Sequence, residues 1–324
     1  MKTRRIAVLG AGAWGTALST MWAKRAHNIV LWGRSGSRIE ELRRSANFQG
    51  SFAPTNDLQD CTGADLIVFV TRSTALRETA AALRKIEINS EAVLLSCIKG
   101  IERGTGKRMS EILAEIFPKH AIAVLSGPNL AAEISQGLPT ATVLAFAEPD
   151  RAIELQSYLG TRRFRVYTSS DLAGTELGGA LKNVFAIAAG AGDGLGLGDN
   201  SKAALVTRAL AEMVRLGTKM GGELRTFYGL SGAGDLIATC FSQQSRNRRT
   251  GEQLVTGRSL EEIASSVGTV AEGIPTAKSA RECARKLGVE TPIIDQVYAL
   301  LYGGKSPARA MEELLQREQK AETI

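Results

Sequence analysis

The first half of the chain takes its architecture from one segment, Ile6-Ala7-Val8-Leu9-Gly10-Ala11-Gly12-Ala13-Trp14-Gly15. A short apolar run leads into a GxGxxG pattern, a helical stretch follows, and a second apolar run comes within about thirty residues, the span of one βαβ unit. In that context the first glycine, Gly10, permits a tight turn. Gly12 lets the backbone approach a diphosphate, and Gly15 lets the helix pack on the strand. Because N–H groups at a helix start favour anions, the stretch predicts a dinucleotide-binding turn.

Apolar, often β-branched runs recur along the first half and alternate with helical stretches. Several runs are apolar throughout, which is typical of a parallel sheet buried on both faces. Residues 1–170 are therefore predicted to form a Rossmann-like, doubly wound α/β domain. The expected strands are Arg5–Leu9, Ile29–Trp32, Leu66–Val70, Val93–Cys97, Ile122–Leu125, Ala141–Phe146 and Phe164–Tyr167, with helices such as Thr16–Arg25, Thr74–Lys85 and Arg108–Phe117 between them.

The pattern changes near Asp171 to long helical segments broken by glycine. Residues 171–324 are therefore predicted to form a second domain that is all helical and binds the substrate. Glycine-rich loops are expected at 190–200 and 229–234. The expected helices are Leu177–Ala189, Ala203–Met220, Leu260–Ser265, Thr276–Lys286, Asp295–Leu301 and an amphipathic tail, Arg309–Ile324.

The composition restricts the chemistry. The chain has only two histidines, His27 and His120, so a Ser-His-Asp triad or a histidine-rich metal site is not expected. Its four cysteines form no CxxC pair, which predicts neither a zinc site nor a disulfide framework and favours a reducing, cytoplasmic compartment. No apolar run reaches the ~18 residues that span a bilayer. Any proton transfer is expected to use a lysine or a carboxylate.

The net charge of +7 favours anionic ligands. Aromatic residues make up only 5% of the chain, and no stacking platform for bases is present. Phosphorylated small molecules are therefore preferred to nucleic acid. At the end of the second expected strand, Trp32-Gly33-Arg34 lacks the acid that binds the ribose 2′-hydroxyl of NAD, and Arg34 can pair with a 2′-phosphate. This favours NADP, with a solvated surface arginine as the alternative.

Lys182 is the only charged residue between Glu176 and Asp193. It lies beside an apolar stripe at i, i+3, i+4 and i+7 spacing, so its ammonium would be partly desolvated. Such a lysine is a candidate proton donor, because burial and nearby cations bring its pKa towards working pH. Spacing alone leaves a second interpretation open, a lysine that extends to water.

Polar residues follow other expected strands and helices. Lys99 closes one strand and Gly127-Pro128-Asn129 closes the next, which places them at the ligand edge of an open α/β sheet. Ser245-Arg246-Asn247-Arg248 is read as a basic loop that can clamp a phosphate or a carboxylate. Each of these motifs is also compatible with an ordinary turn or a solvated surface.

Taken together, these segments resemble the NAD(P)-dependent glycerol-3-phosphate dehydrogenases of the bacterial type. The resemblance covers nearly the whole chain in the family's order. The combination of a lysine-asparagine helix with an SRNR segment is highly specific. The matching segments are GAGAWGTAL at 10–18, VLWGR at 30–34, IKG at 98–100, SGPNLA at 126–131, LKNVFAIAAG at 181–190, TRALAEMVRLG at 207–217, GAGDLIATC at 232–240, QSRNRR at 244–249 and VAEG at 270–273.

The resemblance implies reversible hydride transfer between NADPH or NADH and dihydroxyacetone phosphate, giving sn-glycerol 3-phosphate for phospholipid synthesis. It implies a cytoplasmic homodimer. Lys182 matches the family's proton donor, Lys99 a contact of both substrate and cofactor, and Asp235 an acid near the catalytic lysine. The further substrate residues implied are Gly127, Asn129, Thr239, Ser245, Arg246 and Asn247. The implied cofactor residues are Gly10, Gly12, Ala13, Trp14, Gly15, Arg34, Lys99, Ala131, Arg246, Val270 and Glu272, and no metal is implied.

Two departures from the family pattern concern the cofactor. Thr71-Arg72-Ser73 stands where Pro-Ser is common after the third strand, and Ala13 replaces a frequent serine. Three other functions stay open from the residues alone. One is another NADP-dependent hydroxy- or keto-acid reductase in which Arg246 grips a carboxylate. The second is a nucleotide-sensing regulator without chemistry, and the third is a basic nucleic-acid binder.

Overall fold

The chain forms two compact units in the computed structural model, which describes residues 4–25, 27–45, 52–267, 271–319 and 321–322. The first unit comprises Met1–Ile98 and Arg108–Leu172, and the second comprises Lys99–Lys107 and Ala173–Ile324. The sequence assigned 99–107 to the first domain, whereas the contacts of this segment lie with the second unit.

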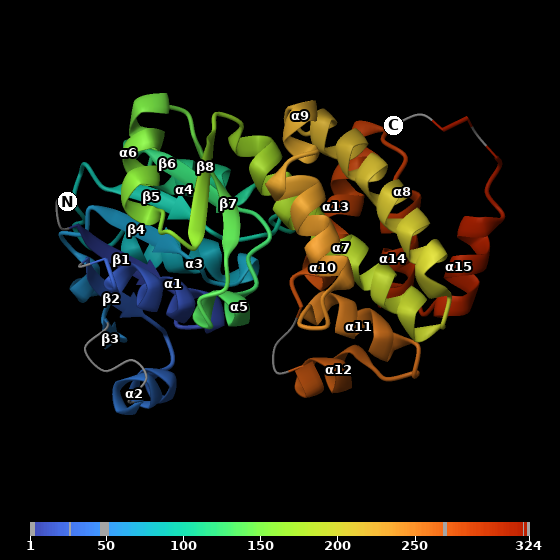
Figure 1. The fold of residues 1–324 in the computed structure, drawn as a ribbon, viewed down its shortest axis with the longest axis horizontal. Coiled ribbons are helices and arrows are strands. Elements are labelled where there is room, and N and C mark those ends of the chain that lie inside the picture. Colours follow the sequence, from blue (N-terminus) through green and yellow to red (C-terminus); the bar gives the residue numbers. More distant parts are fainter. Residues whose placement is uncertain (1–3, 26, 46–51, 268–270, 320, 323–324) are drawn as a thin grey trace. The chain divides into compact units, whose positions relative to one another are not determined.

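The first unit is built on one eight-stranded sheet of order β3-β2-β1-β4-β5-β6-β7-β8 (Figure 1). All neighbouring strands are parallel except β6 and β7, so the predicted Rossmann-like sheet is confirmed with one antiparallel pair. The sequence missed β3, whose three residues include Pro54 and show no periodicity. The strands are β1 Arg5–Leu9, β2 Asn28–Trp32, β3 Ala53–Thr55, β4 Leu66–Phe69, β5 Val93–Ser96, β6 Ile122–Ser126, β7 Thr140–Phe146 and β8 Phe164–Ser169.

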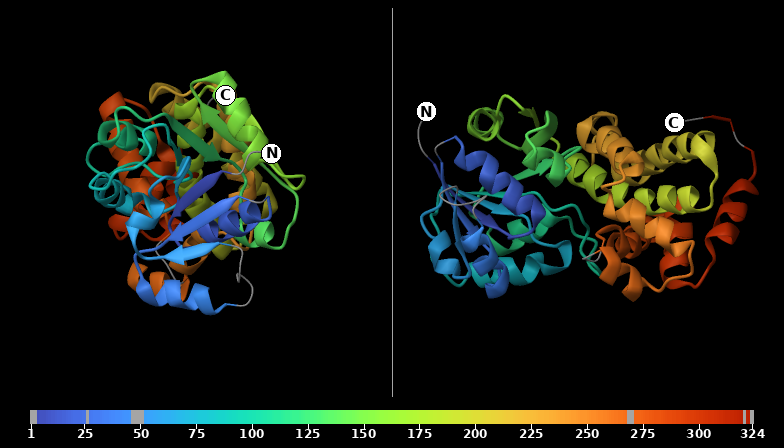
Figure 2. Two further views of the ribbon diagram at one scale, coloured as in Figure 1. Left: turned by 90° about the vertical axis from the view of Figure 1, so that its left-hand side faces the viewer. Right: turned by 60° about the horizontal axis from the view of Figure 1, so that its bottom comes forward.

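Helices cover both faces of this sheet, and the strands fan out side by side in the left-hand view of Figure 2. One face packs against α1, α2, α5 and α6, and the other packs against α3 and α4. Continuously apolar strands are the consequence, because neither face meets water. The helices are α1 Ala13–Ala23, α2 Gly36–Arg44, α3 Leu76–Leu83, α4 Met109–Ile116, α5 Ala131–Ser135 and α6 Pro149–Leu159.

The register of the central strands aligns their carboxyl ends. Leu9 pairs with Trp32 on one side and with Phe69 on the other. Gly10 and Gly33 therefore follow the strands at the same edge. The strand order reverses between β1 and β4, and ligands of open α/β sheets bind at such a switch point. Both histidines lie just ahead of strands, His27 before β2 and His120 before β6, so they are remote from this edge.

The second unit is helical and has a core of its own, as predicted. Its central helix, α7, is buried on nearly all sides by α8, α10, α13 and α14. A helix surrounded in this way must be apolar around its whole circumference, which explains the small and apolar residues of 177–191. The helices are α7 Leu172–Gly194, α8 Gly198–Lys219, α9 Leu224–Phe227, the π-helical turn Leu230–Gly234, α10 Asp235–Phe241, α11 Arg246–Leu254, α12 Leu260–Val267, α13 Gly273–Leu287, α14 Pro292–Tyr302 and α15 Pro307–Leu315.

Several local predictions for this unit were wrong. The loop expected at 190–200 is mostly helix, since α7 runs to Gly194 and α8 begins at Gly198. The segment read as a basic loop is the start of α11, with Ser245 as its cap. Within the described ranges, no helix combines the length and the apolar character needed to cross a bilayer.

Candidate active site

The glycine turn after β1 has the geometry that a diphosphate requires. Gly10 has φ +134°, and a Cβ there would lie 2.8 Å from the carbonyl carbon and oxygen of Val70. A Cβ at Gly15 would lie 1.9 Å from the Gly10 carbonyl oxygen, so α1 packs directly on the turn. At Gly12, by contrast, no described atom lies within 4 Å of the position of a Cβ. The turn is thus closed on its protein side and open at the helix start, and it fits a dinucleotide phosphate.

The turn after β2 lies against the glycine turn. A Cβ at Gly33 would come within 2.7 Å of the Ala11 Cβ, so no acidic side chain can stand there. Arg34 comes next and is exposed, with its NH1 3.3 Å from Glu78 Oε2. Ala13 is exposed and Trp14 is partly buried on the sheet core, while Ala131 opens α5. Arg72, one of the departures, is exposed and caps the short 3₁₀ turn Ser73–Ala75.

The loop after β6 is anchored to β7. Gly127 has φ +156°, and a Cβ there would lie 3.0 Å from the Thr142 Cα. Asn129 donates from Nδ2 to the Ala141 carbonyl (3.2 Å) and accepts at Oδ1 from the Thr142 hydroxyl (2.9 Å). Its amide therefore braces the loop, and its role in substrate binding stays a prediction.

The second unit buries a cluster of two lysines and one aspartate. Lys182 on α7 donates from Nζ to Asp235 Oδ1 at 2.9 Å and to Thr239 Oγ1 at 2.6 Å. Lys99 donates from Nζ to the other oxygen of the same carboxylate, Oδ2, at 2.6 Å. The side chains of Lys182 and Lys99 are 8% and 18% exposed. Lys182 is therefore held inside the unit and does not extend to water.

Burial and charge shift the titration of this cluster. Burial, together with the positive charge of Lys99, lowers the pKa of Lys182 to about 8, although the Asp235 carboxylate opposes the shift. Burial alone would raise the pKa of Asp235, but the two ammonium groups lower it below its ordinary value. The cluster thus holds an ionised carboxylate and an ammonium that can release a proton near neutral pH.

A chain of side-chain amides leads from α13 towards the Lys99 segment. The Gly273 N–H donates to Asn247 Oδ1 (2.9 Å), and Asn247 Nδ2 donates to Asn183 Oδ1 (2.8 Å). Asn183 Nδ2 in turn donates to the Lys99 carbonyl at 3.4 Å and to the Gly179 carbonyl at 3.3 Å. The Asn247 side chain, read from the sequence as part of a phosphate clamp, is therefore engaged inside the unit. The sequence analysis gave Asn183 no role of its own, although the lysine-asparagine helix of the family resemblance includes it.

The start of α11 presents the other predicted clamp residues. Ser245 is buried and caps the helix by accepting a hydrogen bond from the Arg248 N–H at 3.2 Å. Arg246 is the first residue of the helix and is exposed. Glu272 stands at the cap of α13, whereas Val270 lies outside the described residues.

The predicted site residues divide between the units. The first unit holds Gly10, Gly12, Ala13, Trp14, Gly15, Arg34, Gly127, Asn129 and Ala131. The second brings Lys99, Lys182, Asp235 and Thr239 into direct contact and holds Ser245, Arg246, Asn247 and Glu272.

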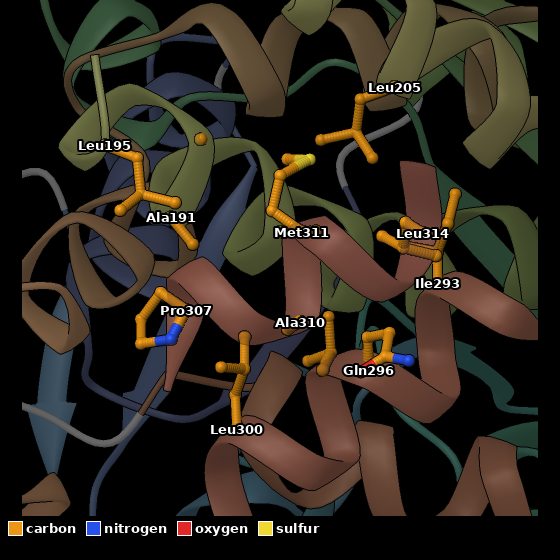
Figure 3. A pocket seen from close by; sticks show the side chains of 13 residues that line it. Ala191, Leu195, Leu205, Ile293, Gln296, Leu300, Pro307, Ala310, Met311 and Leu314 are labelled. Atoms are coloured by element: carbon orange, nitrogen blue, oxygen red, sulfur yellow. The ribbon is translucent and has the colours of Figure 1, made fainter. Parts of the chain in front are cut away.

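A different hollow lies at the C-terminal end of α7. In Figure 3 the hollow is lined by Ala191 of α7, Leu195 just after that helix, Leu205 of α8, and Met311 and Leu314 of α15. Its lining contains no charged side chain, and its Gln296 is bonded to Glu313. This hollow is unsuited to a phosphate. The described residues also contain no group of three or more histidine, cysteine or acidic side chains that could hold a metal ion.

Two family models match the chain. The model of the NAD-dependent glycerol-3-phosphate dehydrogenase N-terminus matches residues 5–152, and that of the C-terminus matches residues 171–312. The chain is 44% identical to a glycerol-3-phosphate dehydrogenase (NAD(P)+) of Syntrophotalea carbinolica, covering 98% of this chain and 99% of the relative. It is 42% identical to that of Geobacter sulfurreducens, covering 99% of each chain.

Solved structures of glycerol-3-phosphate dehydrogenases are also similar to this chain. The glycerol-3-phosphate dehydrogenase of Coxiella burnetii has a TM-score of 0.92 and 35% identity, covering 97% of this chain and 99% of the other. That of Saccharomyces cerevisiae has a TM-score of 0.82 and 25% identity, covering 98% and 100%. A ketopantoate reductase of Ralstonia eutropha, at 17% identity and a TM-score of 0.63, shares the fold alone.

A Rossmann sheet with an open glycine turn, followed by a helical unit with a buried lysine, defines the class of nicotinamide-dependent oxidoreductases. Within that class the chain belongs to the NAD-dependent glycerol-3-phosphate dehydrogenase family.

Proposed function

We propose that the chain interconverts dihydroxyacetone phosphate and sn-glycerol 3-phosphate with NADPH or NADH. Family membership over nearly the full length supports the reaction. The single observation that carries the mechanism is the buried contact of Lys182 with Asp235 and Thr239. The glycine turn and Arg34 would hold the cofactor. The nicotinamide, when bound, supplies or accepts the hydride at C2 of the substrate.

Lys182 is the proton donor in this proposal. An ammonium group has three N–H donors, and two of them are used by Asp235 and Thr239. No residue within the described ranges accepts the third, which can donate to the ketone oxygen. As that oxygen gains negative charge, Lys182 transfers a proton to it and becomes a neutral amine, for which a pKa of about 8 is well placed. In the oxidation of glycerol 3-phosphate the neutral amine takes the hydroxyl proton.

Lys99 and Asp235 have supporting roles. The Lys99 ammonium stabilises negative charge developing on the oxygen, since a fixed charge in a site with little water costs no reorganisation during the reaction. Asp235 fixes the positions of both ammonium groups through its two oxygens. Glu212, Cys240 and the histidines are not needed in this scheme.

The substrate phosphate is proposed to bind at the start of α11. Ser245 and Arg246 lie there, the N–H groups of a helix start favour anions, and the Arg246 guanidinium can form two parallel hydrogen bonds to phosphate oxygens. Asn247 contributes through its place in the helix, because its side chain is bonded to Asn183 and Gly273. On the family resemblance we also propose Gly127 and Asn129 as substrate contacts, and Ala131, Val270 and Glu272 as cofactor contacts.

An absorbance assay of reduced nicotinamide tests the reaction. Dihydroxyacetone phosphate should be reduced with NADPH, with NADH or with both, while ketopantoate and 3-keto acids should give rates at least about a hundredfold lower, because they lack the phosphate that orients the carbonyl. Turnover of a keto acid in place of the ketose phosphate would replace this function by the reductase alternative.

The family resemblance also suggests a cytoplasmic homodimer whose product enters phospholipid synthesis. Sedimentation equilibrium of the purified chain checks the assembly, and a mass near one chain would contradict it. Restoration of phospholipid synthesis by the gene, in cells that lack their own dehydrogenase, checks the physiological role.

A further inference from the structure

The turn between β2 and α2 carries a second arginine to which the proposed function gives no role. Arg38 lies in the first turn of α2, a nine-residue helix, and its side chain is 37% exposed. Its Nε donates to the Ala11 carbonyl oxygen at 3.3 Å. Ala11 lies between Gly10 and Gly12. The Arg38 guanidinium is thus attached to the turn that is proposed to hold the diphosphate.

The two turns are neighbours through the backbone as well. The Gly10 N–H donates to the Trp32 carbonyl at 2.8 Å, and the space beside Gly33 is filled by Ala11 and Ile39. In dinucleotide-binding domains the ribose next to the adenine lies where these two turns meet. The residue at that place in this chain, Gly33, offers no carboxylate to a ribose 2′-hydroxyl. The groups that remain there are the guanidinium groups of Arg34 and Arg38.

Both guanidinium groups have donors available for an anion. Arg38 uses NH1 for Glu41 at 2.5 Å and Nε for Ala11, and its NH2 has no hydrogen bond to any residue in the described ranges. Arg34 pairs with Glu78 across 3.3 Å, and both of these side chains are more than two-thirds exposed. Exposed ion pairs of this kind are weak. A phosphate dianion can therefore displace the glutamates from the two arginines or bind the arginines alongside them.

We propose that Arg38 is a specificity-determining residue that, together with Arg34, selects NADPH over NADH by binding the 2′-phosphate. The inference rests on the nicotinamide cofactor of the proposed function. A phosphate accepts charge-assisted hydrogen bonds from two guanidinium groups, whereas the 2′-hydroxyl of NADH can use at most one of them weakly. Because Arg38 is fixed to Ala11, its charge is positioned before the cofactor arrives.

The test measures nucleotide binding apart from catalysis. Adenosine 2′,5′-bisphosphate carries the 2′-phosphate and 5′-AMP lacks it, and neither contains nicotinamide. Calorimetric titration of the full chain should show tighter binding of the bisphosphate. In Arg38→Ala the dissociation constant of the bisphosphate should rise about tenfold while that of 5′-AMP changes less than about twofold, as expected for the loss of one hydrogen bond to a charged group.

Arg43→Ala is the matched control. Arg43 lies on the same helix, pairs with Glu40 at 2.6 Å and donates to the Pro54 carbonyl, so its loss changes the net charge equally without touching the glycine turn. It should alter binding of either nucleotide less than about twofold, since salt screens an exposed charge that makes no direct contact with the nucleotide. Equal weakening of both nucleotides in Arg38→Ala would show that Arg38 only supports Ala11. No weakening of the bisphosphate, or equal affinity of the unmodified chain for both nucleotides, would overturn the proposal.

Kinetics provide the second readout. In Arg38→Ala the ratio of kcat/KM for NADPH to that for NADH should fall about tenfold, in line with the binding data. If the unmodified chain reduces no ketose phosphate, the proposed function fails. The titrations still decide the role of Arg38 in that case.

Discussion

One carboxylate holds two ammonium groups in the second unit. Asp235 accepts from Lys182 at Oδ1 and from Lys99 at Oδ2, and Thr239, one turn along α10, fixes the Lys182 Nζ from another side. Two positive charges and one negative charge leave an excess of one positive charge in a buried place. Burial lowers the pKa of Lys182, and the positive charge of Lys99 adds to the shift while Asp235 opposes it. The excess positive charge also prepares the cluster for a substrate oxygen that becomes negative.

The titration of Lys182 predicts the pH dependence of both reaction directions. Reduction needs the ammonium, so kcat/KM for dihydroxyacetone phosphate should fall as pH rises through about 8. Oxidation of glycerol 3-phosphate needs the neutral amine and should rise over the same range. Lys182→Ala should lower kcat by roughly 10²–10⁴ and remove the pH dependence near 8 from both reaction directions. Near-normal turnover or an unchanged limb in this variant would exclude Lys182 as the proton donor.

Replacing Asp235 by asparagine tests the shared carboxylate. Two buried ammonium groups would lose their counter-charge, which should cost about 3–5 kcal/mol of unfolding free energy and move the limb assigned to Lys182 to lower pH. Denaturant titration and the pH profile measure the two effects. Asp295→Asn is the control, since its pair with Arg281 is partly exposed and should contribute less than about 1 kcal/mol. A limb that stays near pH 8 without Asp235 would contradict the role given to this carboxylate.

Helices α7 and α11 approach each other backbone to backbone. A Cβ at Gly190 would lie 1.8 Å from the Arg248 carbonyl oxygen, and a Cβ at Gly251 would lie 2.0 Å from that of Ile187. No side chain fits between these helices at either point. The contact fixes the start of α11, with Ser245 and Arg246, relative to the helix that carries Lys182.

Glycine-to-alanine changes on these helices should therefore change the unfolding free energy in opposite directions at contact positions and at open positions. Gly251→Ala should reduce the unfolding free energy by about 1–3 kcal/mol and raise the KM for dihydroxyacetone phosphate, because the methyl group forces the helices apart. At Gly192 on α7 a Cβ meets only Leu197 Cδ1 at 3.8 Å, an ordinary contact. Gly192→Ala should instead stabilise by roughly 0.4–1 kcal/mol, through helix propensity and a less flexible unfolded chain. Equal effects of the two changes in thermal or denaturant unfolding would refute the close approach of α7 and α11.

Helix α14 is capped by a side chain from α8. The buried Glu212 accepts from the N–H groups of Ile293 and Ile294 at 2.9 Å each, and burial raises its pKa to about 7. The folded state therefore binds the proton more strongly than the unfolded state. The stabilisation that comes from this proton on Glu212 is fully present below about pH 4.5 and is lost as pH rises through about 7.

Comparison with Glu212→Gln, whose side chain does not titrate, isolates this contribution. The unfolding free energy of the unmodified chain, relative to that of the variant, should be higher at pH 5 than at pH 8 by roughly 2–3 kcal/mol. Urea titrations at the two pH values measure it. A pH-independent difference would mean that Glu212 titrates alike in both states.

At the scale of the whole molecule, the hydrophobic cores follow the two units. Two clusters cover the faces of the sheet in the first unit, and one cluster fills the helical unit. All three tryptophans, Trp14, Trp22 and Trp32, lie in the first unit, whereas the second is built mainly of helices. Tryptophan fluorescence therefore reports on the first unit, and circular dichroism is weighted towards the second.

This division predicts how a nucleotide stabilises the chain. Adenosine 2′,5′-bisphosphate at a hundredfold excess over its dissociation constant should add about 2.7 kcal/mol to the unit that binds it. The melting transition followed by tryptophan fluorescence should move to higher temperature more than the one followed by circular dichroism. Equal shifts by both probes would show that the two units unfold as one.

Sequence patterns located the elements better than their ends. The predicted strand Arg5–Leu9 matches β1 residue for residue, because a strand buried on both faces needs an unbroken apolar run. Helix α2, with five charged residues among its nine, was missed because it lies on the surface with only Ile39 and Leu42 buried. Gly190 and Gly194 were read as loop, although both lie on α7 against a neighbouring segment: a Cβ at Gly190 would lie 1.8 Å from the Arg248 carbonyl oxygen, and one at Gly194 would lie 2.8 Å from Val255 Cγ2.

The two-part architecture, the dinucleotide turn and the family could be inferred without coordinates, because they depend on local periodicity, on glycine stereochemistry and on motifs that stay together along the chain. The sequence also indicated Lys182, since a lone charge in an apolar helix stands out. Only the folded chain reveals what Lys182 contacts, that the Asn247 side chain is bonded to Asn183, and that Arg38 is bonded to the glycine turn. These contacts join residues that are 27 to 64 positions apart, and a side chain's partner at that separation is set by how whole elements pack.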